Sequence, residues 1–267
     1  MTAINTNVGA LMSRANAKSA DSRMQTHMRR LSSGLRVNSA SDDAAGLAVA
    51  NKLKSQLRGI DMGIRNSADA IGMLQTADAG LSTAMNITLR MKELAIQMAN
   101  DIYTTTDRAN ALVEFSQLGS QIDAIAANTT FNDDVLLDGS ISLSMRIGNG
   151  NAETVTIAID DADVYTTTTT IATAASAATS ATTLGTAIDT LSNAQADVGA
   201  YVNRLQFNID NLTNASTVAE TAVGRVLDTD YARETGELAK QQILNQAATS
   251  MLAQANQSKQ SILALLQ

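Results

Sequence analysis

Side chains that could carry out catalysis are scarce in this sequence. The chain has one histidine, His27. It has no cysteine, and this absence excludes disulfides, thiol catalysis and cysteine-ligated metal sites. Two pairs of neighbouring carboxylates, Asp42 with Asp43 and Asp133 with Asp134, could serve acid–base chemistry or bind a metal. At the start of a helix, however, such carboxylates are better explained by the positive end of the helix dipole. We interpret His27 as a surface residue and expect no enzyme activity, no cofactor and no metal.

The charge of the chain argues against a nucleic-acid partner. Its formal net charge is -7 and its pI is about 4.7, whereas binding to phosphates needs a basic face. The most basic stretch is HMRR at 27–30, which we interpret as a solvated helix face. The sequence contains neither a P-loop nor a glycine-rich dinucleotide-binding motif. A structural, self-assembling role is therefore favoured over catalysis or nucleic-acid binding.

The sequence also bears on membrane insertion and secretion. No segment has the length and hydrophobicity of a membrane span, so we expect no membrane partner. Residues 1–20 lack the basic start and apolar stretch of a secretory signal. If the protein leaves the cell, we expect it to use a route that does not remove such a signal.

The composition favours long helices. Apolar residues make up 45% of the chain, but aromatic residues only 3%, and proline is absent. Ala, Leu, Ile, Val and Met suit helix-on-helix packing better than a sheet core. Proline would interrupt helix interiors, so its absence agrees with long uninterrupted helices. We expect a mainly α fold.

The first strong helical pattern covers residues 57–102. Its apolar residues recur in steps of three and four, with polar interruptions at Ser67 and Asp78. The apolar stripe shifts between Met85 and Ile87. Because such a shift changes the local winding of a coiled coil, we expect an irregular seam at this point.

Two further helices are predicted by the same periodicity. Residues 184–226 follow alternating steps of four and three over several heptads, which predicts a coiled-coil seam. A shorter helix is expected near 107–127, with N-cap residues in TTTD at 104–107.

The period changes between these helices. Residues 141–159 alternate apolar with small or polar residues on both sides of GNGNAE, which predicts one β-hairpin. Residues 162–183 are rich in Thr, Ala and Ser and cannot bury a substantial core. We interpret this segment as an exposed loop or linker, or as a surface that carries O-linked modification. The candidate glycosylation sites are Thr166, Thr167, Thr168, Thr169 and Thr170.

The two ends of the chain are similar in character. Residues 1–33 and 236–267 each carry a thin apolar stripe, and neither would form a stable helix alone in water. Exposed apolar surface of this kind indicates a partner. We expect the ends to pair with each other, with other copies, or both. The candidate packing residues are Ile4, Val8, Leu11, Leu252, Ile262, Leu265 and Leu266.

The stretch LSSGLRVNSASDD interrupts the helical pattern near the N-terminus. Gly34 can end the first helix, because glycine readily adopts the left-handed cap conformation. Ser39 with Asp42 fits a capping box for the next helix, and Asp43 adds negative charge to its first turn. We predict a connector at about 34–41 and a counterpart break in VLDTDYA at 226–232.

Several of these stretches resemble one protein family. RLSSGLRVNSASDDAAGLAVANKL (30–53) resembles the N-terminal signature of bacterial flagellin, and the similarity continues in LRMKELAIQMAN (89–100). It returns at the far end, from RVLDTDYARETGELAKQQ to the last residue (225–267). Both ends therefore match the family, and a short middle region separates them.

The resemblance implies an arrangement of long antiparallel coiled-coil helices with a small β-hairpin. Residues 1–40 with 228–267 would pair their helices in an inner terminal coiled-coil domain. Residues 41–140 with 184–227 would form a rod-like helical domain. Residues 141–183 would hold the hairpin and a short variable segment, as in a compact flagellin.

The resemblance also implies a function and partners. Flagellins are structural subunits that self-assemble into the extracellular flagellar filament for motility. They pass unfolded through the flagellar export apparatus with a chaperone, and they meet filament cap and junction proteins. Some members are ligands of the innate immune flagellin receptor. At the matching positions this chain has Arg90, Glu93, Leu94 and Glu114, which would also serve subunit contacts.

Two other readings remain at this point. A hook–filament junction protein shares terminal similarity with flagellin, but the match at 30–53 and the short middle favour the filament subunit. A secreted coiled-coil binding module would be a monomer or small oligomer, whereas a filament subunit would polymerise on seeds.

Overall fold

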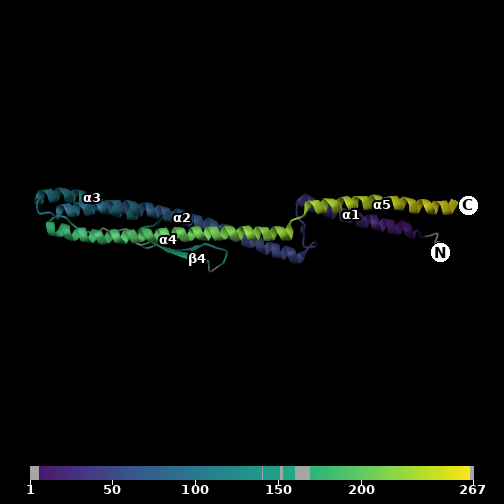
Figure 1. The fold of residues 1–267 in the computed structure, drawn as a ribbon, viewed down its shortest axis with the longest axis horizontal. Helices are drawn as coiled ribbons and strands as arrows, with labels where there is room; N and C mark the ends of the chain where they lie inside the picture. Colours follow the sequence, from purple (N-terminus) through teal and green to yellow (C-terminus); the bar gives the residue numbers. More distant parts are fainter. Residues whose placement is uncertain (1–5, 140, 151–152, 160–168, 265–267) are drawn as a thin grey trace. The chain divides into compact units, whose positions relative to one another are not determined.

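A computed structural model describes residues 6–139, 141–150, 153–159 and 169–264 (Figure 1). In these residues the chain forms five helices and two pairs of short antiparallel strands. The elements are α1 (Val8–Ser33), α2 (Ala44–Met98), α3 (Thr105–Asn128), β1 (Thr130–Phe131), β2 (Asp134–Val135), β3 (Ser142–Arg146), β4 (Thr154–Ala158), α4 (Ala174–Leu227) and α5 (Tyr231–Ala264). The predicted mainly α fold with a hairpin is confirmed.

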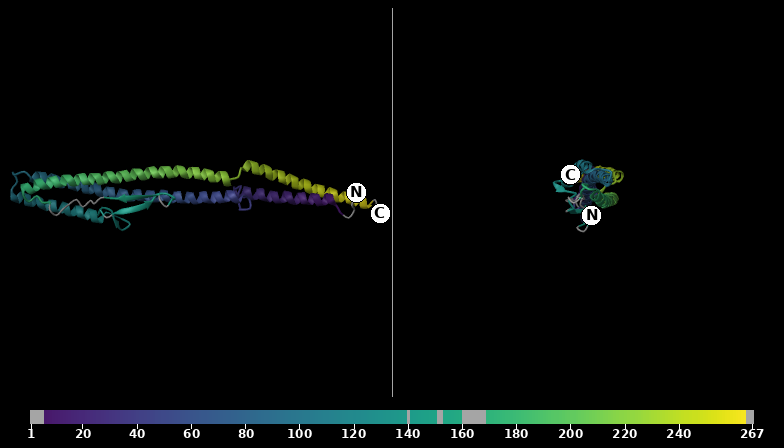
Figure 2. Two further views of the ribbon diagram at one scale, coloured as in Figure 1. Left: turned by 90° about the horizontal axis from the view of Figure 1, so that it is seen from below. Right: turned by 90° about the vertical axis from the view of Figure 1, so that its left-hand side faces the viewer.

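The chain divides into two compact units. Residues 1–55 and 218–267 form one, which we call the terminal unit, and residues 56–217 form the other, the central unit. In the central unit, α2 and α4 lie side by side in both views (Figures 1 and 2).

The central unit is organised by a continuous seam on α2. Its buried positions recur in steps of three and four: Ser67, Ala70, Leu74, Ala77, Leu81, Ala84, Thr88, Met91, Ala95 and Met98. Met85 and Ile87 are only half-buried beside this seam. The predicted shift between them is therefore wrong. Small residues continue the seam where the pattern of large apolar residues was interrupted.

Two polar residues fit into this seam because their hydroxyls have partners. Thr88 Oγ1 donates to the carbonyl of Ala84, and Ser67 Oγ donates to that of Gly63, each over 2.8 Å. These bonds to the preceding turn satisfy the buried hydroxyls, and Ser67 Oγ also accepts a hydrogen bond from Asn208 Nδ2 of α4 over 3.2 Å. Ser67 is thus part of the core and not an interruption of it.

Helix α4 begins earlier than the sequence pattern predicts. It starts at Ala174, inside the Thr/Ala/Ser-rich segment, and Ile171 before it is fully buried. Ser180 is also buried, and its hydroxyl bonds both the N–H and the carbonyl of Thr170. The prediction of an exposed loop is therefore wrong for residues 174–183, which are helical, and for the buried Thr169 and Ile171 before them. Alanine has the highest helix propensity, and here it extends the helix and packs.

Helix α3 begins with a capping box. Thr104 Oγ1 accepts a hydrogen bond from the N–H of Asp107, and the Asp107 carboxylate accepts one from the N–H of Thr104. In the first turn, the buried Arg108 donates to the carbonyls of Met98 and Asn100, each over 2.9 Å. Its guanidinium therefore satisfies the Met98 carbonyl at the end of α2. It also bonds the Asn100 carbonyl in the turn that follows, which accepts from the N–H of Tyr103 as well.

Strands β3 and β4 form the predicted hairpin, with Met145 opposite Val155 in the register. Its apolar face joins the core of the central unit through Val155 and Ile157. Asn66 of α2 donates to the carbonyl of Arg146 over 2.9 Å. Asn208 of α4 donates to that of Ile147, also over 2.9 Å. Both long helices thus hold the hairpin in place.

The short β1–β2 pair was not predicted. Asn132 and Asp133 join its strands, and both have positive φ angles, 51° and 69°. Two-residue hairpin turns need such angles, and Asn and Asp tolerate them better than most residues. The Asn132–Asp133 dipeptide was therefore the feature of the sequence that could have predicted this turn.

Candidate functional site

The paired helices α1 and α5 leave much of their apolar surface uncovered. Ala20 is the one buried residue among those of α1. The large exposed apolar side chains on the two helices are Val8, Leu11, Met12, Met28, Tyr231, Ile243, Leu244 and Met251. The terminal unit therefore presents an unusually apolar surface for a pair of helices in water.

The predicted packing residues fall into three groups. Val8 and Leu11 are exposed on α1, and Leu252 is half-buried on α5. Ile262 lies in α5, although its side chain is outside the described part of the structure. Ile4, Leu265 and Leu266 also lie outside the described residues.

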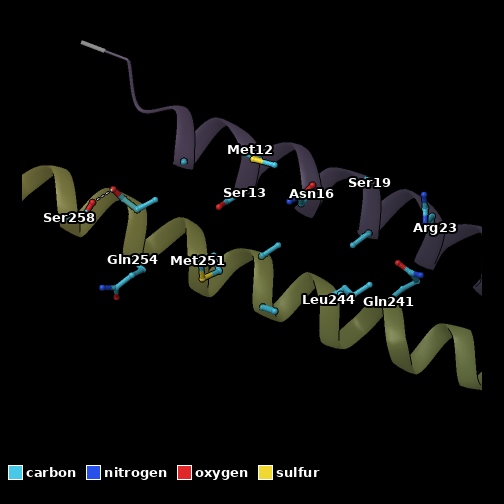
Figure 3. A pocket seen from close by; sticks show the side chains of 15 residues that line it. Met12, Ser13, Asn16, Ser19, Arg23, Gln241, Leu244, Met251, Gln254 and Ser258 are labelled. Carbon is cyan, nitrogen blue, oxygen red and sulfur yellow. Dashed lines mark hydrogen bonds between the residues drawn. The ribbon is translucent and has the colours of Figure 1, made fainter. Parts of the chain in front are cut away.

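A groove of about 740 Å³ lies between α1 and α5 (Figure 3). We call it the terminal groove. Small residues such as Gly9 and Ala248 on its two walls leave this space. The Gln241 side chain also lines it, although the residue is only 3% exposed. Near one end, Asn7 accepts from the N–H of Ala10 and donates to the carbonyl of Ala255, each over 3.1 Å.

A polar cluster joins α1 to α5 at the other end of the helices. Glu234 is only 7% exposed. Its carboxylate lies 2.5 Å from His27 Nδ1 and accepts a hydrogen bond from Arg30 Nη1 over 3.1 Å. Burial raises the pKa of Glu234, but the bonds from His27 and Arg30 together outweigh it and lower that pKa below its usual value.

This cluster corrects two sequence interpretations. His27 is not a surface residue, and the HMRR stretch is not wholly a solvated face, because His27 and Arg30 pack on α5. Residue 27 and residue 234 are far apart in the sequence, so no local spacing could reveal their contact. No group of three potential metal-binding side chains occurs among the described residues.

In the terminal unit, the connector between α1 and α2 contacts the connector between α4 and α5. Gly34 is the C-cap of α1, with a left-handed φ of 71° and its N–H donating to the carbonyl of Arg30. Leu35 forms a β-bridge with Asp228. The bonds from Arg36 N to Leu227 O, 2.6 Å, and from Thr229 N to Gly34 O, 3.0 Å, hold the two connectors together.

The capping interpretation of Ser39 and Asp42 is wrong. Asp42 Oδ2 accepts hydrogen bonds from the backbone N–H of Asn38 and from the N–H and hydroxyl of Ser39. These bonds close a turn before the helix and lower the pKa of Asp42, the Ser39 hydroxyl most strongly. Asp43 is the residue that caps α2, because its Oδ1 accepts from Gly46 N over 2.8 Å.

The predicted contact motif on α2 has a charged surface and an apolar base. Arg90 donates to Glu114 on α3 over 3.0 Å and to Glu93 over 3.2 Å. All three side chains are half-exposed or more, and these bonds raise the pKa of Arg90, the one to Glu114 most strongly. Leu94 is only 4% exposed and packs in the core beside Phe115. The prediction that Leu94 itself makes a surface contact is therefore wrong, because its side chain lies in the core and supports the charged surface from beneath.

The structure removes Thr169 from the candidate glycosylation sites. Thr169 is only 7% exposed, and Thr170 is half-buried with its backbone bonded to Ser180. Thr169 is therefore too buried to carry a glycan in this fold. Thr166, Thr167 and Thr168 lie outside the described residues.

Membrane insertion has no support in the described helices. None of them combines the length and the apolar character that a bilayer crossing requires.

Comparison with known proteins gives consistent matches at both ends of the chain. Residues 4–142 match the bacterial flagellin N-terminal helical region, and residues 181–266 match its C-terminal helical region. A flagellin of Halalkalibacterium halodurans is 39% identical over 271 residues, covering 98% of this chain and 99% of that protein.

Solved structures agree with the sequence comparison. The crystal structure of Bacillus cereus flagellin is 35% identical, with a TM-score of 0.52, and the match covers 55% of this chain and 88% of that one. A flagellar hook-associated protein of Vibrio parahaemolyticus has a TM-score of 0.62 over 70% of this chain and 100% of that one. Its identity is 13%, so this second likeness shows the fold alone.

Proposed function

The chain belongs to the bacterial flagellin family and is a structural subunit of the flagellar filament, and on this premise we propose which surfaces build the filament. Residues 1–40 with 228–267 pack against the same residues of neighbouring copies as an inner layer. Residues 41–140 with 184–227 form the rod outside it, and 141–183 add the hairpin and a short variable segment. The exposed apolar surface of α1 and α5 is the observation that carries this proposal.

The apolar surface supports packing between copies because no part of the described chain covers it. Val8 and Leu11 on α1 and Ile243 and Met251 on α5 are all more than half exposed. Burial of such side chains supplies the main favourable term in most protein association. In a helical polymer each contact is heterologous and open, so a single subunit type can extend the filament without limit.

Removal of the C-terminal end tests the inner layer. A chain that lacks residues 250–267 should keep the helical content of the central unit, measured by circular dichroism, but should not elongate filament seeds. A point variant gives a finer test: Leu11→Ser with Ile243→Ser should slow elongation, whereas the control Ala127→Ser, at an exposed position of α3, should not. Normal filaments of the truncated chain in the electron microscope would refute the proposed inner layer.

We further propose that the chain reaches the filament through the flagellar export apparatus, with a chaperone, and is added beneath a filament cap protein. Its final location on this proposal is the extracellular filament, next to junction proteins at the base. Cells with an inactive export apparatus should retain the chain inside, whereas active cells should carry it on their surface. Equal surface amounts in both strains, measured by immunoblotting of sheared filaments, would contradict this route.

The charged surface around Arg90 is proposed as the contact for subunits and for the innate immune flagellin receptor. Arg90, Glu93 and Glu114 form one exposed ion-pair network, and Leu94 supports it from the core. Arg90→Ala with Glu114→Ala should weaken receptor signalling in reporter cells. The matched control is Glu237→Ala with Lys240→Ala, which removes an exposed ion pair of the terminal unit. Equal signalling by both double variants would contradict the proposed contact.

A further inference from the structure

Two exposed methionines share the terminal groove. Met12 of α1 is 67% exposed and Met251 of α5 is 61% exposed, and both line the groove (Figure 3). We propose that this pair is a peroxide-sensitive modification site, and that oxidation of Met12 and Met251 to sulfoxides stops the chain from joining a filament. The inference rests on the proposed packing of the terminal unit between copies.

The oxidation needs only hydrogen peroxide as its co-reactant. The thioether sulfur attacks one peroxide oxygen, the O–O bond breaks, and a new S–O bond forms. The sulfur is oxidised to a sulfoxide, and the rest of the peroxide leaves as water after proton transfer. Because the oxidant must reach the sulfur, exposed methionines react before buried ones. Met73, Met91 and Met98 are buried in the central unit and serve as internal references.

Oxidation changes the chemistry of the groove. A sulfoxide converts a flexible apolar side chain into a polar one. The groove walls include apolar side chains such as Ala248 and Leu244 as well as polar ones such as Asn16 and Gln254. A neighbouring copy that covers the groove would remove the sulfoxide oxygens from water, and burial of a polar group costs free energy even where neighbouring polar side chains compensate in part. Assembly would in turn shield both sulfur atoms from the oxidant.

Oxidation at the terminal groove should differ in its effect on elongation from oxidation of exposed methionines elsewhere in the chain. Met62 of the central unit is also 50% exposed, but it does not line the terminal groove. It should therefore oxidise in the free chain without stopping elongation. Leucine is close in volume to methionine and cannot be oxidised in this way, so Met→Leu variants keep the packing while removing the reactive sulfur.

The test measures oxidation and elongation on the same sample of the full chain. Purified chain is treated with hydrogen peroxide, its sulfoxides are located by peptide mass spectrometry, and its elongation of filament seeds is followed by light scattering. Met12 and Met251 should oxidise before Met73, Met91 and Met98. Elongation should slow by about tenfold or more, and methionine sulfoxide reductases should restore it.

Two variants complete the test. Met12→Leu with Met251→Leu should elongate after peroxide at the rate it has before treatment, whereas the control, Met62→Leu, should lose elongation as the wild type does. Equal sensitivity of the groove variant and the wild type would overturn the inference. If the groove variant elongates slowly before treatment, failure of the reductases to rescue the oxidised wild type would overturn it instead. Failure of untreated wild type to elongate seeds would refute the proposed function, which is a separate result.

Discussion

Removal of the Glu234 carboxylate tests what holds the terminal unit together. The carboxylate lies against His27 and Arg30, whose side chains are only 15% and 27% exposed. A buried polar group that loses its partner costs about 1–3 kcal/mol, and breaking a fully buried ion pair costs about 3–5 kcal/mol. Because the cluster is partly exposed, Glu234→Ala should lower the free energy of unfolding of the terminal unit by about 2–3 kcal/mol. Glu234→Gln keeps an oxygen acceptor and should cost about half as much.

Hydrogen exchange followed by mass spectrometry measures this loss in the correct part of the chain. Peptides from α1 and α5 should exchange faster in Glu234→Ala, whereas peptides from the central unit should not change. Glu237→Gln is the matched control, because Glu237 forms an exposed pair with Lys240 over 3.4 Å. Exposed pairs of this kind contribute about 0–1 kcal/mol. Unchanged exchange in α1 and α5 of Glu234→Ala would refute a stabilising role for the cluster.

The same carboxylate makes the terminal unit sensitive to acid. The pKa of Glu234 is lowered in the folded chain from its usual 4.5, since the His27 and Arg30 bonds outweigh the effect of burial. A lowered folded pKa contributes stability that is present above the unfolded pKa and is lost as the pH falls through the folded value. Wild-type α1 and α5 should therefore lose protection below pH 4.5 more steeply than in Glu234→Gln. Parallel acid profiles of the two proteins would contradict this assignment.

Four further substitutions test local features of the fold by urea unfolding. Arg108→Met should cost about 1–2 kcal/mol, because the Met98 carbonyl at the end of α2 loses the Arg108 donor. Gly63→Ala should destabilise the central unit, since a Cβ there would lie 2.9 Å from the carbonyl of Ile147. Gly72→Ala, which meets nothing within 4 Å, should instead stabilise it by about 0.5–1 kcal/mol. Asp43→Ala should cost about 1 kcal/mol through the lost N-cap of α2.

The features that the sequence predicted well depend on local information. The seam of α4 follows the spacing of Leu184, Leu191, Val198 and Leu205, all of which are buried. The cap of α3 depends on residues three positions apart, and the β3–β4 hairpin depends on alternation around a Gly/Asn turn. Periodicity and capping are local consequences of backbone geometry, so a single sequence carries them.

The features that were missed depend on small residues or on distant partners. Ala84 and Thr88 carry the seam of α2, but neither stands out in a pattern of large apolar residues. Ser39 and Asp42 have the spacing of a capping box, yet they close a turn because Asp43 lies nearer the helix start. The contact of His27 with Glu234 joins positions 207 residues apart, and tertiary packing alone creates it.

The two units differ in the kind of contact that stabilises them. The central unit buries large side chains, including Leu74, Leu81 and Phe115. The terminal unit depends on a polar cluster, bonds between its connectors and a small core around Val37 and Leu227. Since large apolar side chains stabilise most when buried, the terminal unit should open locally at a lower free energy than the central unit. Neighbouring copies would supply the missing apolar burial, so exchange of α1 and α5 amides should slow far more on assembly than exchange in the central unit.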